Sequence, residues 1–260
     1  MKKRIFQTLI CLFWLTSVFL TANAQSPLAQ AVPAFKLEMQ QSGGTNGSSV
    51  TYDPLKGIYY AVIAGNAAFP LEAFDRKGKP LGASEAGADL RGIWMNGSTL
   101  EGNCPGEVGW VSIELTNSGK PSGQTSSIVE DELQPDFQSV GTFDPKKKEV
   151  IFYANGNLNF YSRKKRSLSR IVMLNGSDAS FPDNINATSV GFTGKKGYEY
   201  ALLDYNDYKV LYFNKKGNQT GSTDIPEDAI INDAFRFSFA NSMLWLYDVD
   251  TRSWSGYKVF

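Results

Sequence analysis

The sequence repeats itself at intervals of 42 to 50 residues, and this repeat constrains the fold more than any other feature of the chain. The start of each unit is a short strand-like run: VTYDP from Val50, GIWMN from Gly92, GTFDP from Gly141, GFTGK from Gly191 and RFSFA from Arg236. This interval is typical of one four-stranded blade of a β-propeller. Five copies of the run therefore predict five blades.

The unit from Val50 to Gly82 shows what one blade contains. Three runs rich in Tyr and Val (VTYD, IYYAVIA and LEAFD) are separated by turn signals, and Lys77-Gly78 leads into a fourth run. Each run is too short for a typical helix and is bounded by turn-forming residues. The unit is therefore predicted to be a β-meander of four strands.

The fifth unit ends one strand short of a complete blade. Near the other end of the chain, AFKLEMQQ (34–41) alternates apolar and polar residues and belongs to no unit. We expect it to pair beside the last strand, which would close the ring and remove an exposed strand edge. A β-sandwich is the main alternative, because regularly spaced hairpins can also produce a weak repeat.

The order of first strand, Asp-Pro turn, second strand, third strand ending in Phe-Asp, then Lys-Gly resembles the short-turn blades of secreted propellers of the NHL and YVTN type. The resemblance covers most of the chain but is carried by strand pattern and glycine turns alone. Those families usually have six or seven blades, so a count of five departs from them. The resemblance implies no binding residue.

Residues 1–24 have the pattern of a secretory signal peptide. Lys2, Lys3 and Arg4 precede an apolar run from Ile5 to Leu20, and small residues follow at 22–24. We therefore expect residues 25–260 to form a single propeller domain that is secreted or periplasmic, with no stable membrane insertion after cleavage.

The chain contains no histidine, and this limits its chemistry. Catalysis by Ser-His-Asp or Cys-His groups and metal binding by histidine are excluded. Without the leader, 23 basic and 26 acidic residues give a net charge of −3, which does not favour a nucleic-acid partner. Cys104 is then the one remaining cysteine, and we interpret it as a small buried thiol rather than a reactive group.

Charge separates according to the order of the strands. In an antiparallel blade, the first-to-second and third-to-fourth turns share one end of the disc, and the second-to-third turns and the links between blades share the other. The first end holds 16 basic residues: Lys56, Arg76, Lys77, Lys79, Lys120, Lys146, Lys147, Lys148, Arg163, Lys164, Lys165, Arg166, Lys195, Lys196, Lys215 and Lys216. The opposite end holds 17 acidic residues: Glu85, Asp89, Glu107, Glu130, Asp131, Glu132, Asp136, Asp178, Asp183, Asp204, Asp207, Asp224, Glu227, Asp228, Asp233, Asp248 and Asp250. The sequence thus predicts a basic and an acidic end, although such residues also occur as ordinary solvated surface.

Two long polar stretches, Pro121 to Pro135 and Asn175 to Asn186, lack any periodicity and are expected to be surface loops.

Candidate ligand-binding residues come from the acidic-end loops, where aromatic residues stand beside amides and carboxylates. These residues are Phe69, Trp110, Asn155, Asn157, Tyr205, Asn206, Asp207 and Trp254. Such a combination suits sugar rings, which stack on aromatic faces and hydrogen-bond through their hydroxyls. Packing between blades is the competing explanation for each aromatic residue.

Metal binding is a second expectation for the same loops. Asp204 and Asp207 in LLDYNDYK, and Asp248 and Asp250 in YDVDTR, could supply oxygen ligands to calcium. Neither segment matches a complete calcium-loop motif, and aspartates also form turns without any ion. No other cofactor is expected.

The sequence favours an exported, non-catalytic scaffold that binds a carbohydrate or protein ligand at its acidic end. A carboxylate-based glycoside hydrolase is the alternative, since that mechanism needs two acids and no histidine. A structural component of the cell envelope is the third hypothesis. Enzymatic activity is left open, and the oligomeric state is undetermined.

Overall fold

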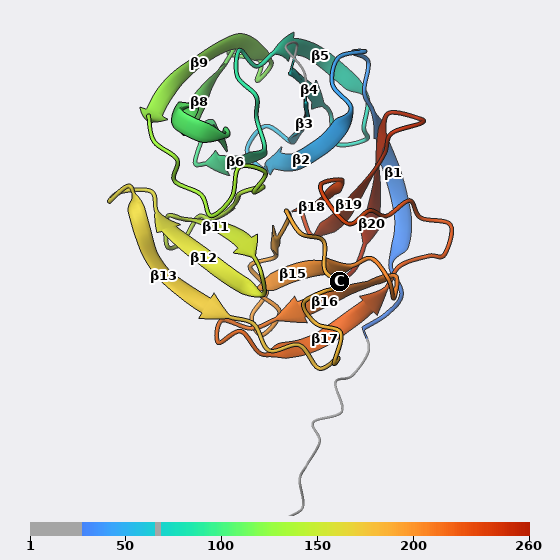
Figure 1. Ribbon diagram of the computed structural model, residues 1–260. Coiled ribbons are helices and arrows are strands. Elements are labelled where there is room, and N and C mark those ends of the chain that lie inside the picture. Colours follow the sequence, from blue (N-terminus) through green and yellow to red (C-terminus); the bar gives the residue numbers. More distant parts are fainter. Residues whose placement is uncertain (1–27, 66–68) are drawn as a thin grey trace, which may run out of the picture.

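A computed structural model describes residues 28–65 and 69–260, and within them the chain forms five small antiparallel sheets arranged around a central axis (Figure 1). The all-β, five-bladed propeller predicted from the repeat is confirmed, and the sandwich alternative is wrong. The expected signal peptide lies outside the described residues. No helix in the described segments is long and apolar enough to cross a membrane.

Each of the first four blades is a meander of four strands, numbered from the axis outward. Blade 1 contains β2 (Asn46–Asp53), β3 (Ile58–Ala64), β4 (Pro70–Phe74) and β5 (Pro80–Glu85). Blade 2 contains β6 (Gly92–Asn96), β7 (Thr99–Asn103), β8 (Trp110–Leu115) and β9 (Pro121–Val129), with a short 3-10 helix, η1 (Gly106–Val108), between β7 and β8. Blade 3 contains β10 (Thr142–Asp144), β11 (Glu149–Ala154), β12 (Asn157–Ser162) and β13 (Ser167–Met173). Blade 4 contains β14 (Gly191–Phe192), β15 (Tyr200–Asp204), β16 (Lys209–Phe213) and β17 (Gln219–Asp224).

The two ends of the chain meet in blade 5. This sheet contains β18 (Phe237–Ala240), β19 (Met243–Asp248), β20 (Ser253–Lys258) and, as its outermost strand, β1 (Val32–Glu38). Strand β1 pairs antiparallel with β20, with Pro33 opposite Tyr257 and Leu37 opposite Trp254. The predicted closure of the ring by an N-terminal strand is therefore confirmed.

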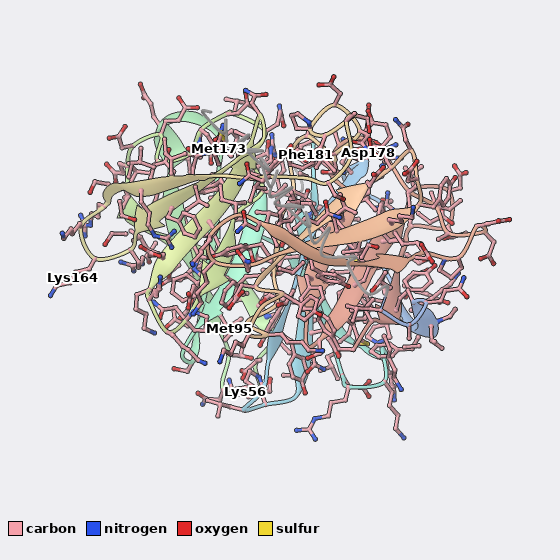
Figure 2. All side chains as sticks on the ribbon, turned by 90° about the horizontal axis from the view of Figure 1, so that it is seen from below. Lys56, Met95, Lys164, Met173, Asp178 and Phe181 are labelled. Carbon is pink, nitrogen blue, oxygen red and sulfur yellow. The ribbon has the colours of Figure 1, made fainter. Side chains whose placement is uncertain are left out.

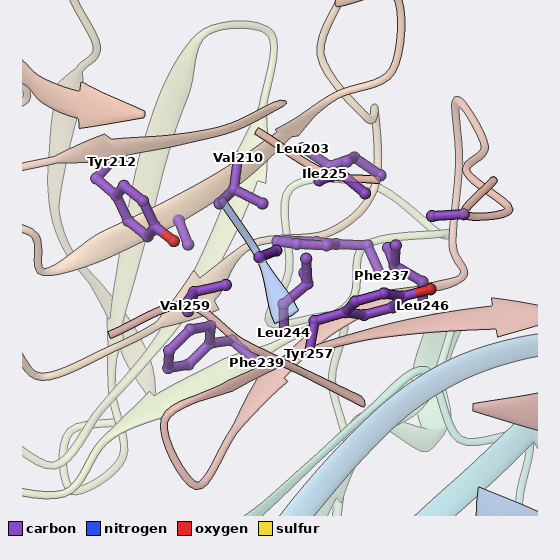
Figure 3. Packing of buried hydrophobic residues seen from close by; sticks show 13 residues of the cluster. Leu203, Val210, Tyr212, Ile225, Phe237, Phe239, Leu244, Leu246, Tyr257 and Val259 are labelled. Atoms are coloured by element: carbon purple, nitrogen blue, oxygen red, sulfur yellow. The ribbon is translucent and has the colours of Figure 1, made fainter. Parts of the chain in front are cut away.

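Buried side chains fill the five interfaces between blades and make up the core. Between blades 4 and 5, for example, Tyr212 packs in one cluster with Phe237, Leu244 and Tyr257 (Figure 3). The second strands face a neighbouring blade on both sides, which is why β3 (IYYAVIA) is buried at every position. Burial of each large side chain contributes roughly 1.5 to 3 kcal/mol, so the interfaces supply most of the stabilisation.

The outermost strands are polar because one side faces solvent. Residues 121–129 (PSGQTSSIV) form β9, so the expectation that the whole of 121–135 is a loop is wrong. The alternation rule failed here because a strand at the rim of a blade buries few side chains. The other stretch, 175–186, contains turns, bends and two isolated bridges and no named strand, as expected of a loop, but Asn184, Ile185 and Asn186 are buried rather than at the surface.

Candidate functional site

A central cavity of about 730 Å³ lies on the propeller axis, and it is the candidate functional site. Its wall is formed by the innermost strands β2, β6, β10, β14 and β18, together with the turns that follow them. An extended strand rises about 3.4 Å per residue, so the stretch from Ser49 to Pro54 gives the wall a height of roughly 17 Å. This volume and depth suit a small ligand.

The residues that line the cavity place its mouth at the end where first strands turn into second strands. Leu55, Gly97, Lys146, Gly194 and Ser242 come from the first-to-second turns of the five blades, and all five border the cavity. Figure 2 shows Lys56 and Met95 at this end of the disc and Asp178 and Phe181 at the other. The cavity therefore opens at the basic end, opposite the loops that the sequence favoured.

Side chains from the links between blades meet at the other end. Arg91, which is 5% exposed, forms an ion pair with Asp89, and its Nε donates to Gln138 Oε1 at 3.1 Å. The Arg91 guanidinium also lies 5.9 Å from the centroid of the Phe235 ring, although Phe235 belongs to the link between blades 4 and 5. Blades 2 and 5 are not neighbours, so this contact bridges the inner edge of blade 1, and the links cover the cavity from this side.

Two buried asparagines hold the links in place. Asn103 Oδ1 accepts hydrogen bonds from the backbone N–H groups of Gly92 (2.9 Å) and Gly141 (3.0 Å), and its Nδ2 donates to Gln134 Oε1 and to Ser139 O. This bonding lets the first strands of blades 2 and 3 approach closely, and a Cβ added to Gly92 would lie 2.3 Å from Gly141 O.

Asn186 has the same role between blades 4 and 5. Its Nδ2 donates to the carbonyls of Asn232 and Phe235, both at 2.9 Å. Sequence reasoning missed Arg91 and both asparagines, because nothing in their local sequence shows that they bond to the links between blades.

The inner wall of the cavity is largely apolar and aromatic. Trp94 and Phe143 stack with ring centroids 6.1 Å apart and planes 21° apart, and half-buried Phe192 and Tyr52 also border the space. Apolar rings of this kind favour a ligand with an apolar body.

Asp144 and Glu199 are the carboxylates among the described lining residues. Asp144 Oδ1 accepts hydrogen bonds from the N–H groups of Lys146 (2.9 Å) and Lys147 (3.1 Å), which fixes the turn after β10. Glu199 Oε2 accepts from the Gly197 N–H at 3.1 Å. Both carboxylates thus have local structural hydrogen bonds.

The predicted ligand-binding residues of the acidic end fall into two groups. Trp110 and Trp254 are fully buried in interfaces between blades, and Phe69 packs against the core between blades 1 and 2. These positions match the packing explanation, and they leave the two tryptophans no accessible surface. None of the eight predicted residues lines the cavity.

The remaining five residues lie in two turns at the surface. Asn155 is exposed and its carbonyl accepts a bond from Asn157 Nδ2, while Tyr205, Asn206 and Asp207 form the turn between β15 and β16. Tyr205 is half-buried and its hydroxyl donates to Asp183 O. A ligand site in these turns stays a prediction.

The four aspartates proposed as calcium ligands belong to two separate turns, which the side chains of Asp204 and Asp248 stabilise. Asp204 Oδ1 accepts from the N–H groups of Asn206 and Asp207, and Asp248 Oδ1 accepts from that of Asp250. Burial raises the pKa of the Asp204 carboxyl above its ordinary value. In the part of the chain that the structure describes, no three potential ligands among His, Cys, Asp and Glu gather to hold a metal ion.

Cys104 lies at the closed end, beside Asp89 and Arg91. The thiol is free and buried, as predicted, and loss of solvation raises its pKa to about 12. A thiol with so high a pKa is a poor nucleophile at neutral pH.

The third-to-fourth turns do not all belong to the basic end. Lys164, in the turn between β12 and β13, lies out toward the side of the disc in Figure 2. The reason is the twist of the sheet, which turns each outer strand away from the direction of the inner one. Part of the basic charge that the sequence assigned to one end therefore lies at the rim, and the division into two charged ends stays a prediction.

Comparison with known proteins supports the fold and assigns no family. No family model matches the chain, and no curated protein matches it. The structure is similar to Myxococcus xanthus glutaminyl cyclase, with a TM-score of 0.57, 11% identity and coverage of 90% of this chain and 100% of the other.

Two propeller structures align less well. The WD40 repeats of RRP9 give a TM-score of 0.45 with 8% identity, covering 88% of this chain and 84% of the other. The β-propeller domain of Myceliophteria thermophila Cps50 (Swd1) gives a TM-score of 0.44 with 10% identity, covering 83% of each chain. At these identities the similarities concern the fold alone.

Proposed function

We propose that this protein is a non-catalytic binding protein, exported from the cytoplasm, that holds a small ligand with an apolar body in its central cavity. The observation that carries the proposal is the cavity itself, which is closed by the links at one end and open between short turns at the other. An apolar body placed beside Trp94 and Phe143 would gain about 25 cal/mol for each Å² removed from water.

The two cavity carboxylates support binding over catalysis. A glycoside hydrolase needs two acids free to face the sugar on either side of the scissile bond. Here Asp144 and Glu199 accept hydrogen bonds from nearby backbone N–H groups. The similarity to a glutaminyl cyclase adds no catalytic residue, because it is a similarity of fold at 11% identity.

Titration with the neutral fluorophore N-phenyl-1-naphthylamine tests the proposal. We expect saturable binding, and we expect the cavity-filling substitution Thr142→Trp to abolish it, because half-buried Thr142 lines the cavity on β10. Met95→Trp fills the same space from β6 and serves if the first variant fails to fold. Asn206→Trp, at the opposite end, is the matched control and should bind normally. Absence of binding, or equal binding by the filled variants, would refute the proposal.

A carbohydrate or protein ligand at the acidic end is a second candidate. The observation in its favour is the turn after β15, where Asn206, Asp207 and Tyr208 are all exposed beside half-buried Tyr205. Binding to a glycan array that is lost in Tyr205→Ala and retained in Thr142→Trp would favour this candidate over the cavity.

A further inference from the structure

Three lysines border the mouth of the cavity, and their ammonium groups have no counter-ion among the residues that the structure describes. Lys146 and Lys147 lie in the turn between β10 and β11, and Lys215 lies in the turn between β16 and β17. All three are exposed, and none of them takes part in the ion pairs found among the described residues.

Neighbouring lysines differ in this respect. Lys148 Nζ donates to Asn96 Oδ1 at 2.8 Å and lies 5.7 Å from the centroid of the Phe143 ring. Lys195 Nζ lies 3.8 Å from the centroid of the Phe260 ring. The cavity lysines thus keep their charge available at the mouth, whereas these two are engaged with side chains of the protein.

The two carboxylates of the cavity do not neutralise these lysines. Asp144 Oδ1 accepts from the backbone of the lysine turn, and the side-chain ammonium groups of Lys146 and Lys147 are not within ion-pair distance of it. Glu199 is 5% exposed and bonds to the Gly197 N–H. An incoming anion would therefore meet ammonium groups first.

We propose that the ligand of the cavity is an amphipathic anion, which inserts its apolar or aromatic body and leaves its anionic group at Lys146, Lys147 and Lys215. The inference rests on the proposed function and adds the chemical class and the orientation of the ligand. The reverse orientation would bring an anionic group among apolar side chains such as Ile93 and Val190, where an unpaired charge is strongly unfavourable.

Two fluorophores with the same ring system separate the inference from the proposed function. 1-Anilinonaphthalene-8-sulfonate differs from N-phenyl-1-naphthylamine only by its sulfonate. Three exposed ion pairs of roughly 0.5 kcal/mol each amount to about 1.4 kcal/mol, or about tenfold. We expect the sulfonate to bind about tenfold more tightly at low ionic strength. We expect this advantage to disappear in 1 M NaCl, where the Debye length is about 3 Å.

The triple variant Lys146→Gln/Lys147→Gln/Lys215→Gln should lose the advantage of the sulfonate and keep its affinity for the neutral probe. The matched control is Lys77→Gln/Lys79→Gln/Lys164→Gln, which removes the same charge from turns that do not line the cavity. That control should bind both probes as the unmodified protein does.

The outcomes distinguish the two claims. If the neutral probe fails to bind, the proposed function is wrong. If the neutral probe binds in the cavity and the sulfonate binds no better, or keeps its advantage in the triple variant, the inference is wrong and the proposed function stands. Displacement by decanoate or by 1-naphthoate then shows whether the apolar body is an aliphatic chain or an aromatic ring, and failure of both to displace the probe would also overturn the inference.

Discussion

The two ends of the propeller axis are bordered by different kinds of connection, and only the acidic end is closed by them. At the basic end, turns such as Pro54–Gly57 and Asn241–Ser242 are short and border the cavity. At the acidic end, the links 130–141 and 225–236 are longer and send Gln138 and Phe235 toward Arg91. The cavity thus opens at the end where these turns border the axis, and not at the end where the sequence placed the aromatic and acidic candidates.

The largest effect is expected at the closed end. Asn103→Ala removes four hydrogen bonds at a fully buried position and leaves the N–H groups of Gly92 and Gly141 without their acceptor. Each unsatisfied buried group costs about 1 to 3 kcal/mol, so the free energy of unfolding should fall by about 4 kcal/mol. Urea denaturation measures the change. The control is Asn206→Ala at an exposed position, which should lower the free energy of unfolding by less than about 0.5 kcal/mol. Equal losses of unfolding free energy in Asn103→Ala and Asn206→Ala would show that the buried bonds of Asn103 do not stabilise the closed end.

Opening the closed end should expose the thiol beside it. Arg91→Ala removes the contacts to Asp89, Gln138 and the Phe235 ring, and should lower stability by about 2 to 3 kcal/mol. We expect alkylation of Cys104 by iodoacetamide to become at least about tenfold faster, since an opening that costs 1.4 kcal/mol less is ten times more populated. An alkylation rate equal to that of the unmodified protein would show that Arg91 does not close the axis.

The raised pKa of Cys104 also predicts how stability depends on pH. An unfolded thiol ionises near pH 8.5, whereas burial raises the folded pKa to about 12. Between these values the unfolded state binds one proton fewer than the folded state. The contribution of the buried thiol to the free energy of unfolding is therefore complete below about pH 8.5. It is then lost at about 1.4 kcal/mol per pH unit as pH rises toward 12. Buried Tyr153 and Tyr212, whose pKa values burial raises to about 12, add to the slope above pH 10.

Chemical denaturation of Cys104→Ala at pH 8, 9 and 10 isolates the thiol contribution. Its stability should fall less steeply with pH than that of the unmodified protein, whatever the cost of the substitution itself. Parallel slopes for the two proteins would show that the thiol is accessible in the folded state.

At the open end the same kind of substitution should have the smallest effect. Asp144→Ala removes the acceptor for two backbone N–H groups in an exposed turn, where water can replace it. We expect a loss of about 1 kcal/mol in urea denaturation. A loss as large as that of Asn103→Ala would mean that the basic end is as tightly built as the acidic one.

The blades could be predicted from sequence because each depends on local signals. Strand runs such as IYYAVIA, and turn signals such as the Asp53-Pro54 pair, give the number and order of strands with no knowledge of the axis. The closure by β1 was also predictable. The fifth unit lacks one strand, and the strand-like run at 34–41 belongs to no other unit, so it could supply the missing strand. The polar strand β9 was missed, since solvent on one side removes the pattern that identifies a strand.

The candidate site could not be predicted in the same way. Whether Arg91 or Lys146 faces the axis depends on how five blades are arranged around it, and that arrangement appears in no local pattern. Sequence could not separate binding aromatics from core aromatics, and Trp110 and Trp254 pack in the interfaces between blades. A usable signal was the position of Lys146 and Lys147 directly after a first strand, where the turn must border the axis.

The most direct test is a crystal structure of the protein grown with N-phenyl-1-naphthylamine. We expect density for one probe molecule inside the ring of first strands, in contact with Phe143 and Phe192 and on the side of the axis bordered by Lys146. Density between Arg91 and Phe235, or against the acidic-end turns with the cavity occupied by water alone, would contradict the assignment of the open end as the binding site.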